Sequence, residues 1–334
     1  MNNKILGVYT SGGDSPGMNA SLRAIVRLAI HNGWKVIGIE KAYKGMLEKN
    51  FKTLDLNFVA QIIQRGGTVL QSSRYPEFLK KEVRQKAYNN LKEQGISALI
   101  CIGGDGSFKG LSALHKEFNI NAVGIPATID NDIYGTDLSL GFDTASNVVL
   151  SAIDCIRDTA DSHGRVFLIE VMGHNFGFLA LHTALSGGAE DVFLPQDNLK
   201  IKLPQVAANI KKRQSRGKKG HILIVAEDLN KQAYSYQIAK QLKTIAPDID
   251  IKVSILGHMQ RGGSPTCLDR SLGARFGIKS VELLEEMFLL NNPKQLAVVL
   301  KQGKISSLDL KDVISRKKEL NEEELSNYIR ILAG

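Results

Sequence analysis

The sequence Ala98-Leu99-Ile100-Cys101-Ile102-Gly103-Gly104-Asp105-Gly106-Ser107 contains a pattern that recurs along the chain. Residues 98–102 form an apolar run that predicts a buried strand, and the glycines that follow end it. A segment with helical periodicity comes next, from about Phe108 to Glu117. The order of strand, glycine-rich turn and helix is typical of parallel α/β sheets, whose ligands bind at the carboxyl ends of the strands.

The same order appears on both sides of this stretch. We expect further strands at residues 5–9, 35–39, 122–125, 166–171, 222–226 and 253–256. We expect further helices at residues 20–32, 79–94, 144–161, 176–186, 234–244 and 268–289. The sequence therefore predicts an α/β protein with two Rossmann-like, three-layer α/β/α domains, mainly parallel sheets and an active site in the cleft between them.

Composition limits the classes of partner. The chain has 334 residues with a formal net charge of +9, and the length fits about two domains. A positive balance suits phosphorylated small molecules as well as nucleic acids. Aromatic residues make up only 6% and do not alternate with the basic runs at 211–213 and 216–219, so we expect no nucleic-acid surface.

Other classes of protein lack support. The three cysteines (Cys101, Cys155 and Cys267) have no metal-binding spacing, and Cys101 lies in an apolar run that predicts core. The chain shows no nucleophile-elbow motif and no histidine spacing typical of zinc enzymes. It contains no apolar run long enough for a bilayer and no signal peptide, which predicts a soluble cytoplasmic protein without a membrane partner.

Two motifs carry candidate chemistry. The glycines of 103–107 allow phosphates to approach a helix N-terminus, and Asp105 could hold Mg2+; a plain tight turn with a helix cap is an equally good interpretation. In the segment 126–132, Asp130 could act as a general base while Asp132 orients Mg2+ or water. Taken alone, the same acids fit an Asx turn with solvated carboxylates.

Two further segments are weaker. The segment 257–265 places Arg261 beside two glycines, which leaves room for an anion, although an ordinary loop fits equally well. In the segment 64–78, Arg74 could reach a phosphate or form a surface salt bridge.

Together these segments resemble the ATP-dependent 6-phosphofructokinases of bacteria, from residue 5 to about residue 289. The opening loop 10–20 and the segments 103–107, 128–132, 172–173 and 257–265 match the family's motifs in order. The resemblance implies transfer of a phosphoryl group from ATP to fructose 6-phosphate. It also implies an ATP-binding domain of residues 1–140 plus 259–309, and a fructose 6-phosphate-binding domain of residues 141–258 plus 310–334.

The resemblance implies the following roles. The residues that would line ATP are Gly13, Arg74, Tyr75, Gly104, Asp105, Gly106 and Ser107, with Asp105 on Mg2+. Catalysis would fall to Asp130 as the base, with Thr128 and Asp132. The residues that would hold the sugar phosphate are Thr128, Asp130, Arg165, Met172, Gly173, His174, Glu227, Lys252, His258 and Arg261. Because Arg165 would reach it from a neighbouring subunit, a homotetramer is expected.

The resemblance also implies an effector site for ADP or phosphoenolpyruvate, formed by Arg23, Arg27, Arg157, Gly188, Glu190, Arg216 and Lys218. Leu56 and Gly220 replace an arginine and a histidine of that site, so we expect altered or weakened allosteric control. In the active site, His174 and Lys252 stand where the family usually has arginine. Both changes predict a lower affinity for the sugar phosphate.

Three alternatives remain at this stage. Pyrophosphate-using relatives usually carry Asp at the position of Gly106 and Lys at the position of Ala127, so these small residues favour ATP. A catalytically silent binding subunit would explain His174 and Lys252. Lipid and NAD kinases share the GGDG loop but lack the segment 258–265. The charged run 316–319 predicts only a solvated helix face.

Overall fold

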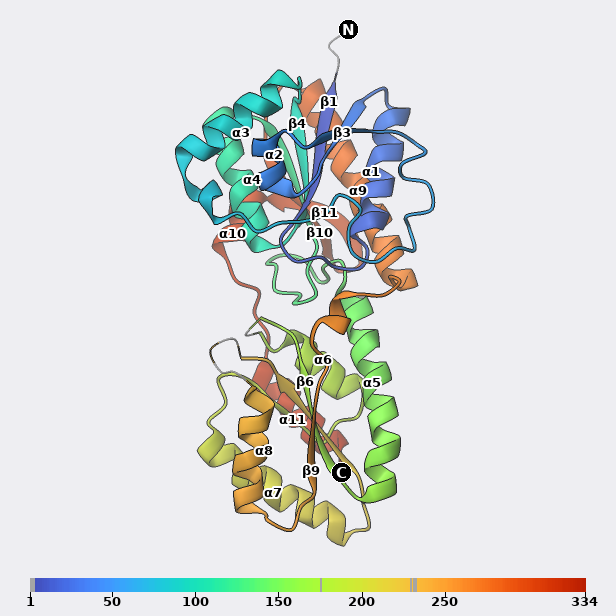
Figure 1. Cartoon of the computed structure of the whole chain (residues 1–334), viewed down its shortest axis with the longest axis vertical. Helices are drawn as coiled ribbons and strands as arrows, with labels where there is room; N and C mark the ends of the chain where they lie inside the picture. Colours follow the sequence, from blue (N-terminus) through green and yellow to red (C-terminus); the bar gives the residue numbers. More distant parts are fainter. Residues whose placement is uncertain (1–3, 175, 229, 231–232) are drawn as a thin grey trace. The chain divides into compact units, whose positions relative to one another are not determined.

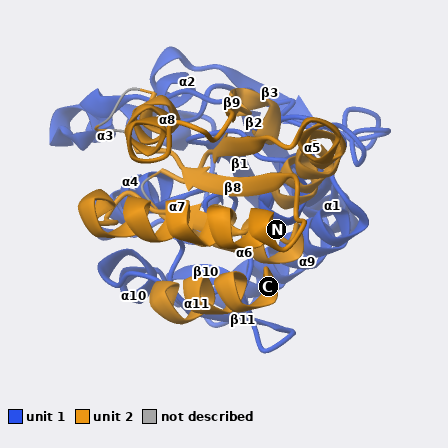
Figure 2. Ribbon diagram, turned by 90° about the horizontal axis from the view of Figure 1, so that it is seen from below, with its two compact units in different colours: residues 1–144, 261–318 blue, residues 145–260, 319–334 orange. Residues whose placement is uncertain are grey.

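The chain forms two compact units in the computed structural model, which describes residues 4–174, 176–228, 230 and 233–334 (Figure 1). The first unit contains residues 1–144 and 261–318, and the second contains residues 145–260 and 319–334 (Figure 2). The chain passes between the units after residues 144, 260 and 318. Residues 310–318 lie in the first unit, because the helix that starts there packs against that unit's core.

The first unit is built on a seven-stranded sheet with the order β11-β10-β5-β4-β1-β2-β3. The edge strands β3 and β11 are antiparallel to their neighbours, and the other pairs are parallel. The strands are β1 (Ile5–Ser11), β2 (Lys35–Ile39), β3 (Phe51–Leu54), β4 (Ala98–Gly103), β5 (Asn121–Pro126), β10 (Gln295–Lys301) and β11 (Lys304–Asp309).

Helices cover both faces of this sheet, which explains why its central strands are apolar throughout. One face packs against α1 (Met18–His31) and α9 (Cys267–Leu289). The other face packs against α2 (Ala42–Glu48), α3 (Lys81–Glu93), α4 (Asp105–Phe118) and α10 (Leu310–Ser315). Successive strand residues alternate between the faces: Val8 belongs to the first core and Tyr9 to the second.

The second unit is built on a four-stranded parallel sheet with the order β7-β8-β6-β9. Its strands are β6 (Val166–Val171), β7 (Asp191–Phe193), β8 (His221–Ala226) and β9 (Ile251–Ile255). One face packs against α7 (Leu199–Ser215) and α8 (Tyr234–Ile245). The other helices are α5 (Phe142–His163), which starts in the first unit, α6 (Phe178–Ser186) and α11 (Glu322–Leu332).

The predicted α/β class with two mainly parallel sheets is confirmed, and β2 and β6 have the predicted bounds. The helix predicted at 79–94 is wrong at its start, because Pro76–Leu79 forms a 3-10 turn and α3 begins at Lys81. The run 316–319 is not a helix face, because α10 ends at Ser315 and the chain is irregular there. In the described part of the chain, no helix is long and apolar enough to cross a membrane.

Candidate active site

Three loops of the first unit follow neighbouring strands at the carboxyl edge of its sheet. Ser11 at the end of β1 pairs with Gly103 at the end of β4, which pairs with Pro126 at the end of β5. A Cβ atom at Gly103 would lie 2.6 Å from the Ser11 carbonyl oxygen, so only glycine allows this approach. The segments that follow these three strands therefore lie side by side, as expected for adjacent parallel strands.

Arg261, which lies far along the sequence, contacts one of these loops. A Cβ atom at Gly13 would lie 2.6 Å from Nη1 of Arg261. This Nη1 donates a hydrogen bond of 3.3 Å to the carbonyl oxygen of Asp14. A Cβ at Gly66 would lie 2.2 Å from the Gly263 carbonyl oxygen. The segments 64–68 and 261–263 thus contact each other, and the structure brings Arg261 to the loop that carries Gly13.

The glycine-rich segment differs from its prediction in one respect. Helix α4 begins at Asp105 rather than near Phe108, so Asp105, Gly106 and Ser107 form its first turn and leave amide groups at the helix N-terminus. The Tyr43 hydroxyl donates a hydrogen bond of 2.5 Å to the Ser107 carbonyl oxygen and holds this turn against α2. A Cβ at Gly106 would meet nothing within 4 Å, so the space beside it is open.

The donor set of this turn fits a magnesium ion that also binds substrate phosphates. Mg2+ commonly takes one or two carboxylates and completes its shell with phosphate oxygens and water. The Asp105 carboxylate is 43% exposed and lies 2.6 Å from the Lys109 ammonium, which is also exposed. Within the described residues, no three acidic, histidine or cysteine side chains gather into a closed metal site. An ion here would therefore depend on the substrate for most of its ligands.

The segment after β5 holds the candidate base. Asp130 is 8% exposed, and its backbone N–H donates to the Thr128 hydroxyl at 3.2 Å. The same hydroxyl donates to the Asp130 carboxylate at 3.4 Å. The Ser139 hydroxyl donates to the Thr128 carbonyl oxygen at 2.7 Å, which ties the turn to the next segment. Asp132, two residues later, is half-buried.

In the second unit, Glu227 organises the predicted sugar-binding residues. Its Oε1 accepts hydrogen bonds from the backbone N–H groups of Gly173 at 3.1 Å and of His174 at 3.0 Å. Gln260 accepts from the N–H of Met172 at 3.2 Å. These hydrogen bonds to Glu227 join the loop that follows β6 to the loop that follows β8. His174 has φ of 49°, a left-handed conformation that is uncommon outside glycine, and the two hydrogen bonds to Glu227 hold it.

Arg165 and Lys252 lie elsewhere in this unit. Arg165 Nε donates to Oδ2 of Asp250 at 2.8 Å, and Lys252 Nζ lies 3.2 Å from Oδ1 of the same carboxylate. The guanidinium of Arg165, followed by Lys252, lowers the pKa of Asp250. Arg165 precedes β6, whereas Met172 follows it. The six residues of β6 thus separate the two groups by roughly 20 Å at ~3.3 Å per residue.

The predicted effector residues divide between the units. Arg23 and Arg27 lie on α1 of the first unit. In the second unit, Arg157 donates to the Gly188 carbonyl oxygen at 3.0 Å, and Lys218 Nζ lies 2.5 Å from the fully buried Glu190 carboxylate. Arg216 directly follows α7. A Cβ at Gly220 would lie 2.4 Å from Oδ1 of Asp161 and 2.6 Å from the backbone nitrogen of the same residue, so this packing excludes a larger side chain such as histidine.

The side chains of Arg74, Tyr75 and His258 make no described contact with these clusters. Arg74 and His258 are exposed, and Tyr75 packs against the core beside α2. The sequence interpretation in turn missed Asp250 and Gln260, each of which joins predicted residues more than eighty positions apart. Asp250 lies outside the motifs, so no local signal could have identified it. Gln260 lies in the segment 257–265, in which the sequence singled out only His258 and Arg261.

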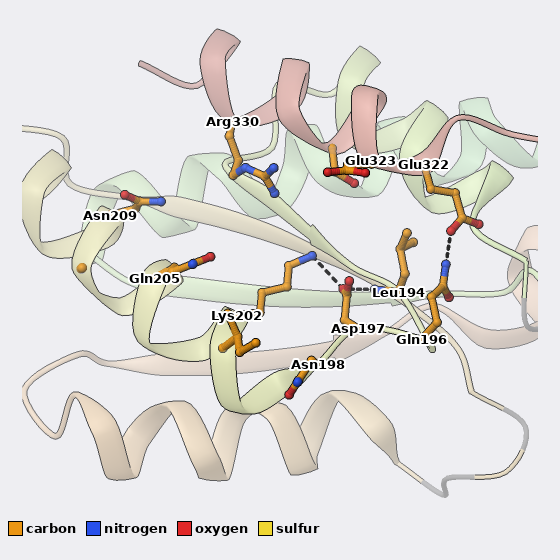
Figure 3. Close-up of a pocket in the computed structure, with 13 residues that line it drawn as sticks. Leu194, Gln196, Asp197, Asn198, Lys202, Gln205, Asn209, Glu322, Glu323 and Arg330 are labelled. Atoms are coloured by element: carbon orange, nitrogen blue, oxygen red, sulfur yellow. Dashed lines mark hydrogen bonds and ion pairs between the residues drawn. The ribbon is translucent and has the colours of Figure 1, made fainter.

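A cavity of about 720 Å³ in the second unit contains none of the predicted residues (Figure 3). It lies between α7 and α11, and the two cations that line it, Lys202 and Arg330, pair with carboxylates. Lys202 lies 2.7 Å from Asp197, Arg330 lies 3.7 Å from Asp191, and Gln196 donates to Glu322. Because these cations are already paired, the cavity does not define a ligand.

Comparison with known proteins agrees with this geometry. A model of the phosphofructokinase family matches residues 5–284. The ATP-dependent 6-phosphofructokinase of Thermoanaerobacter sp. (strain X514) is 45% identical over 330 residues, which cover 98% of this chain and 100% of the relative. ATP-dependent 6-phosphofructokinase 1 of Thermus thermophilus is 47% identical over 320 residues, or 95% and 96% of the two chains.

Among solved structures, phosphofructokinase from Saccharomyces cerevisiae aligns with a TM-score of 0.87 and 32% identity over 94% of this chain. This chain covers 45% of that yeast chain. The family match, the two bacterial relatives and this likeness all extend over most of the sequence. The chain therefore belongs to the phosphofructokinase family.

Proposed function

We propose that this chain is an ATP-dependent 6-phosphofructokinase, which transfers the terminal phosphoryl group of ATP to the 1-hydroxyl of fructose 6-phosphate. The observation that carries the proposal is the 45% identity to an ATP-dependent 6-phosphofructokinase over nearly the whole chain. The open space beside Gly106 adds support, because a nucleotide needs more room there than pyrophosphate does. A glycolytic role in the cytoplasm follows from this reaction.

The first unit would bind ATP, and the second would bind fructose 6-phosphate. The N-terminal turn of α4 would receive the phosphates of ATP, because free amide groups and the helix dipole favour anions. Mg2+ on Asp105 would neutralise charge on the phosphates. Asp130 would accept the proton of the attacking hydroxyl, with Thr128 and Asp132 beside it. Phosphoryl transfer needs positioning and charge neutralisation more than covalent catalysis.

A coupled assay tests the proposed reaction. Fructose 1,6-bisphosphate formation is measured from fructose 6-phosphate with Mg-ATP, and in parallel with Mg-pyrophosphate. We expect turnover with ATP and only background with pyrophosphate, because Gly106 and Ala127 are both small. Turnover with pyrophosphate alone would reverse the donor assignment. No turnover with either donor, from protein that binds both ligands, would indicate a regulatory subunit.

The effector cluster would respond weakly to ADP or phosphoenolpyruvate. Arg157, Glu190 and Lys218 lie together, yet the internal ion pair with the buried Glu190 occupies the Lys218 ammonium. Leu56 adds no charge, although its side chain is 46% exposed and has room for a longer residue. A histidine cannot be introduced at Gly220 in the same way, because neighbouring atoms fill the space beside it.

Leu56→Arg is therefore expected to strengthen the response to phosphoenolpyruvate. A guanidinium at this exposed position would supply a donor for the effector's phosphate, without disturbing the core. We expect the half-inhibitory concentration of phosphoenolpyruvate to fall several-fold in the coupled assay. Leu79→Arg, at another exposed leucine, serves as the control and should leave inhibition unchanged. Equal responses of both variants would contradict a role for position 56.

A further inference from the structure

The segment that ends the first unit contacts the loop that carries Asp130 and Asp132. Arg316 Nη1 donates to the Tyr134 hydroxyl at 3.0 Å, and its guanidinium lies 5.4 Å from the centre of that ring. Lys318 Nζ donates to the carbonyl oxygen of Asp137 at 3.0 Å. The chain enters the second unit at Glu319, the residue after Lys318. The last residues before this passage are therefore held by the loop that carries Asp130 and Asp132.

The carbonyl oxygen of Asp137 is a shared acceptor. It also receives a hydrogen bond of 3.2 Å from Nδ2 of Asn131, the residue between the two carboxylates of the candidate site. Oδ1 of Asn131 accepts from the N–H of Ser139 at 3.0 Å. Asn131 has φ of 51°, so the backbone turns sharply between Asp130 and Asp132. The carbonyl oxygen of Asp137 therefore helps to hold Asn131, and with it this turn, together with Ser139.

The charge of Lys318 also faces this loop. Burial lowers the pKa of Lys318 to about 8, while the carboxylates of Asp137 and then Asp132 act in the opposite direction and favour the ammonium form. Arg316, Lys317 and Glu319 are the neighbouring charges on its own segment, and all three are exposed. A partly buried ammonium group next to two carboxylates is costly unless these partners compensate it. The position of the Lys318 ammonium group is thus coupled to the positions of the Asp132 and Asp137 carboxylates.

We propose that Lys318 is a positioning residue for phosphoryl transfer, which holds the Asp130–Asp132 turn through the carbonyl oxygen of Asp137. The expected effect on kcat rests on the proposed function, whereas the hold of Lys318 on the Asp130–Asp132 turn does not. Lys318 touches neither reactant; it acts through Asn131 and the backbone. A change at Lys318 should therefore affect the chemical step more than the binding of either substrate.

The test compares Lys318→Met, Lys318→Arg and the exposed control Lys317→Met in the full-length protein. Loss of a hydrogen bond from a charged donor is worth ~1.5–3 kcal/mol, so we expect Lys318→Met to lower kcat by at least about 10-fold. Both KM values should stay near those of the unchanged protein. Lys318→Arg keeps the charge and donors and should recover most of kcat. Amide hydrogen exchange of residues 128–139 should accelerate in Lys318→Met alone.

The two readouts separate the two proposals. Wild-type kcat and unchanged exchange in Lys318→Met would overturn the positioning role while leaving the proposed function intact. A rise in KM without a change in kcat would also overturn it. If the unchanged protein shows no turnover, the proposed function fails, and exchange of residues 128–139 still decides whether Lys318 holds the turn.

Discussion

Asp130→Asn is expected to lower kcat by about 10²–10⁴-fold, the usual contribution of a general acid or base. Asparagine has the same size and can still accept a hydrogen bond from Thr128 at this 8% exposed position. It cannot take the proton of the attacking hydroxyl. The affinity for fructose 6-phosphate should change little, because other residues would hold the sugar phosphate.

The measurement is the coupled assay together with calorimetric titration of fructose 6-phosphate. Asp154→Asn makes the same chemical change on the exposed side of α5 and should leave kcat unchanged. A loss of kcat below about 10-fold would argue against Asp130 as the base. Loss of kcat together with loss of sugar binding would instead assign Asp130 a role in holding the substrate.

The sequence predicted seven of the strands, whose signals are local, but not the helices α7 and α11. The central strands are continuous apolar runs, because helices cover both of their faces. The start of α4 was predicted three residues late, since Gly104 and Gly106 are typical of a loop. The Tyr43 hydroxyl, from a helix sixty positions earlier, holds that turn in helical form. Tertiary contacts of this kind override local propensity.

The hairpin of β10 and β11 was missed although a signal for it existed. Residues 296–300 are apolar, and Gln302-Gly303 has positive φ at both positions, as a two-residue turn requires. In the site, the motifs predicted which loops gather at the sheet edge. They could not predict Lys318 or Asp250, because each acts through a partner far away in sequence.

Arg165→Ala is expected to lower kcat/KM for fructose 6-phosphate by about 100-fold, through loss of two charged hydrogen bonds to a phosphate. Arg165 precedes β6 and Glu227 follows β8, so they lie at opposite ends of one sheet. A single sugar phosphate cannot contact both within one chain. Lys211→Ala removes another cation of this unit that is paired with a carboxylate, and should have no such effect.

This geometry makes a mixed oligomer the decisive case. Co-expression of Arg165→Ala and Asp130→Asn chains with different tags gives hybrids, which are purified through both tags. If Arg165 serves the neighbouring subunit, an Arg165→Ala chain that keeps Asp130 receives an intact arginine from its Asp130→Asn neighbour. Turnover of the hybrids should then rise well above that of either parent. If Arg165 serves its own chain, every site lacks one of the two residues, and the hybrids stay as inactive as the parents. The hybrids therefore test a shared site directly, which assembly into a tetramer alone would not.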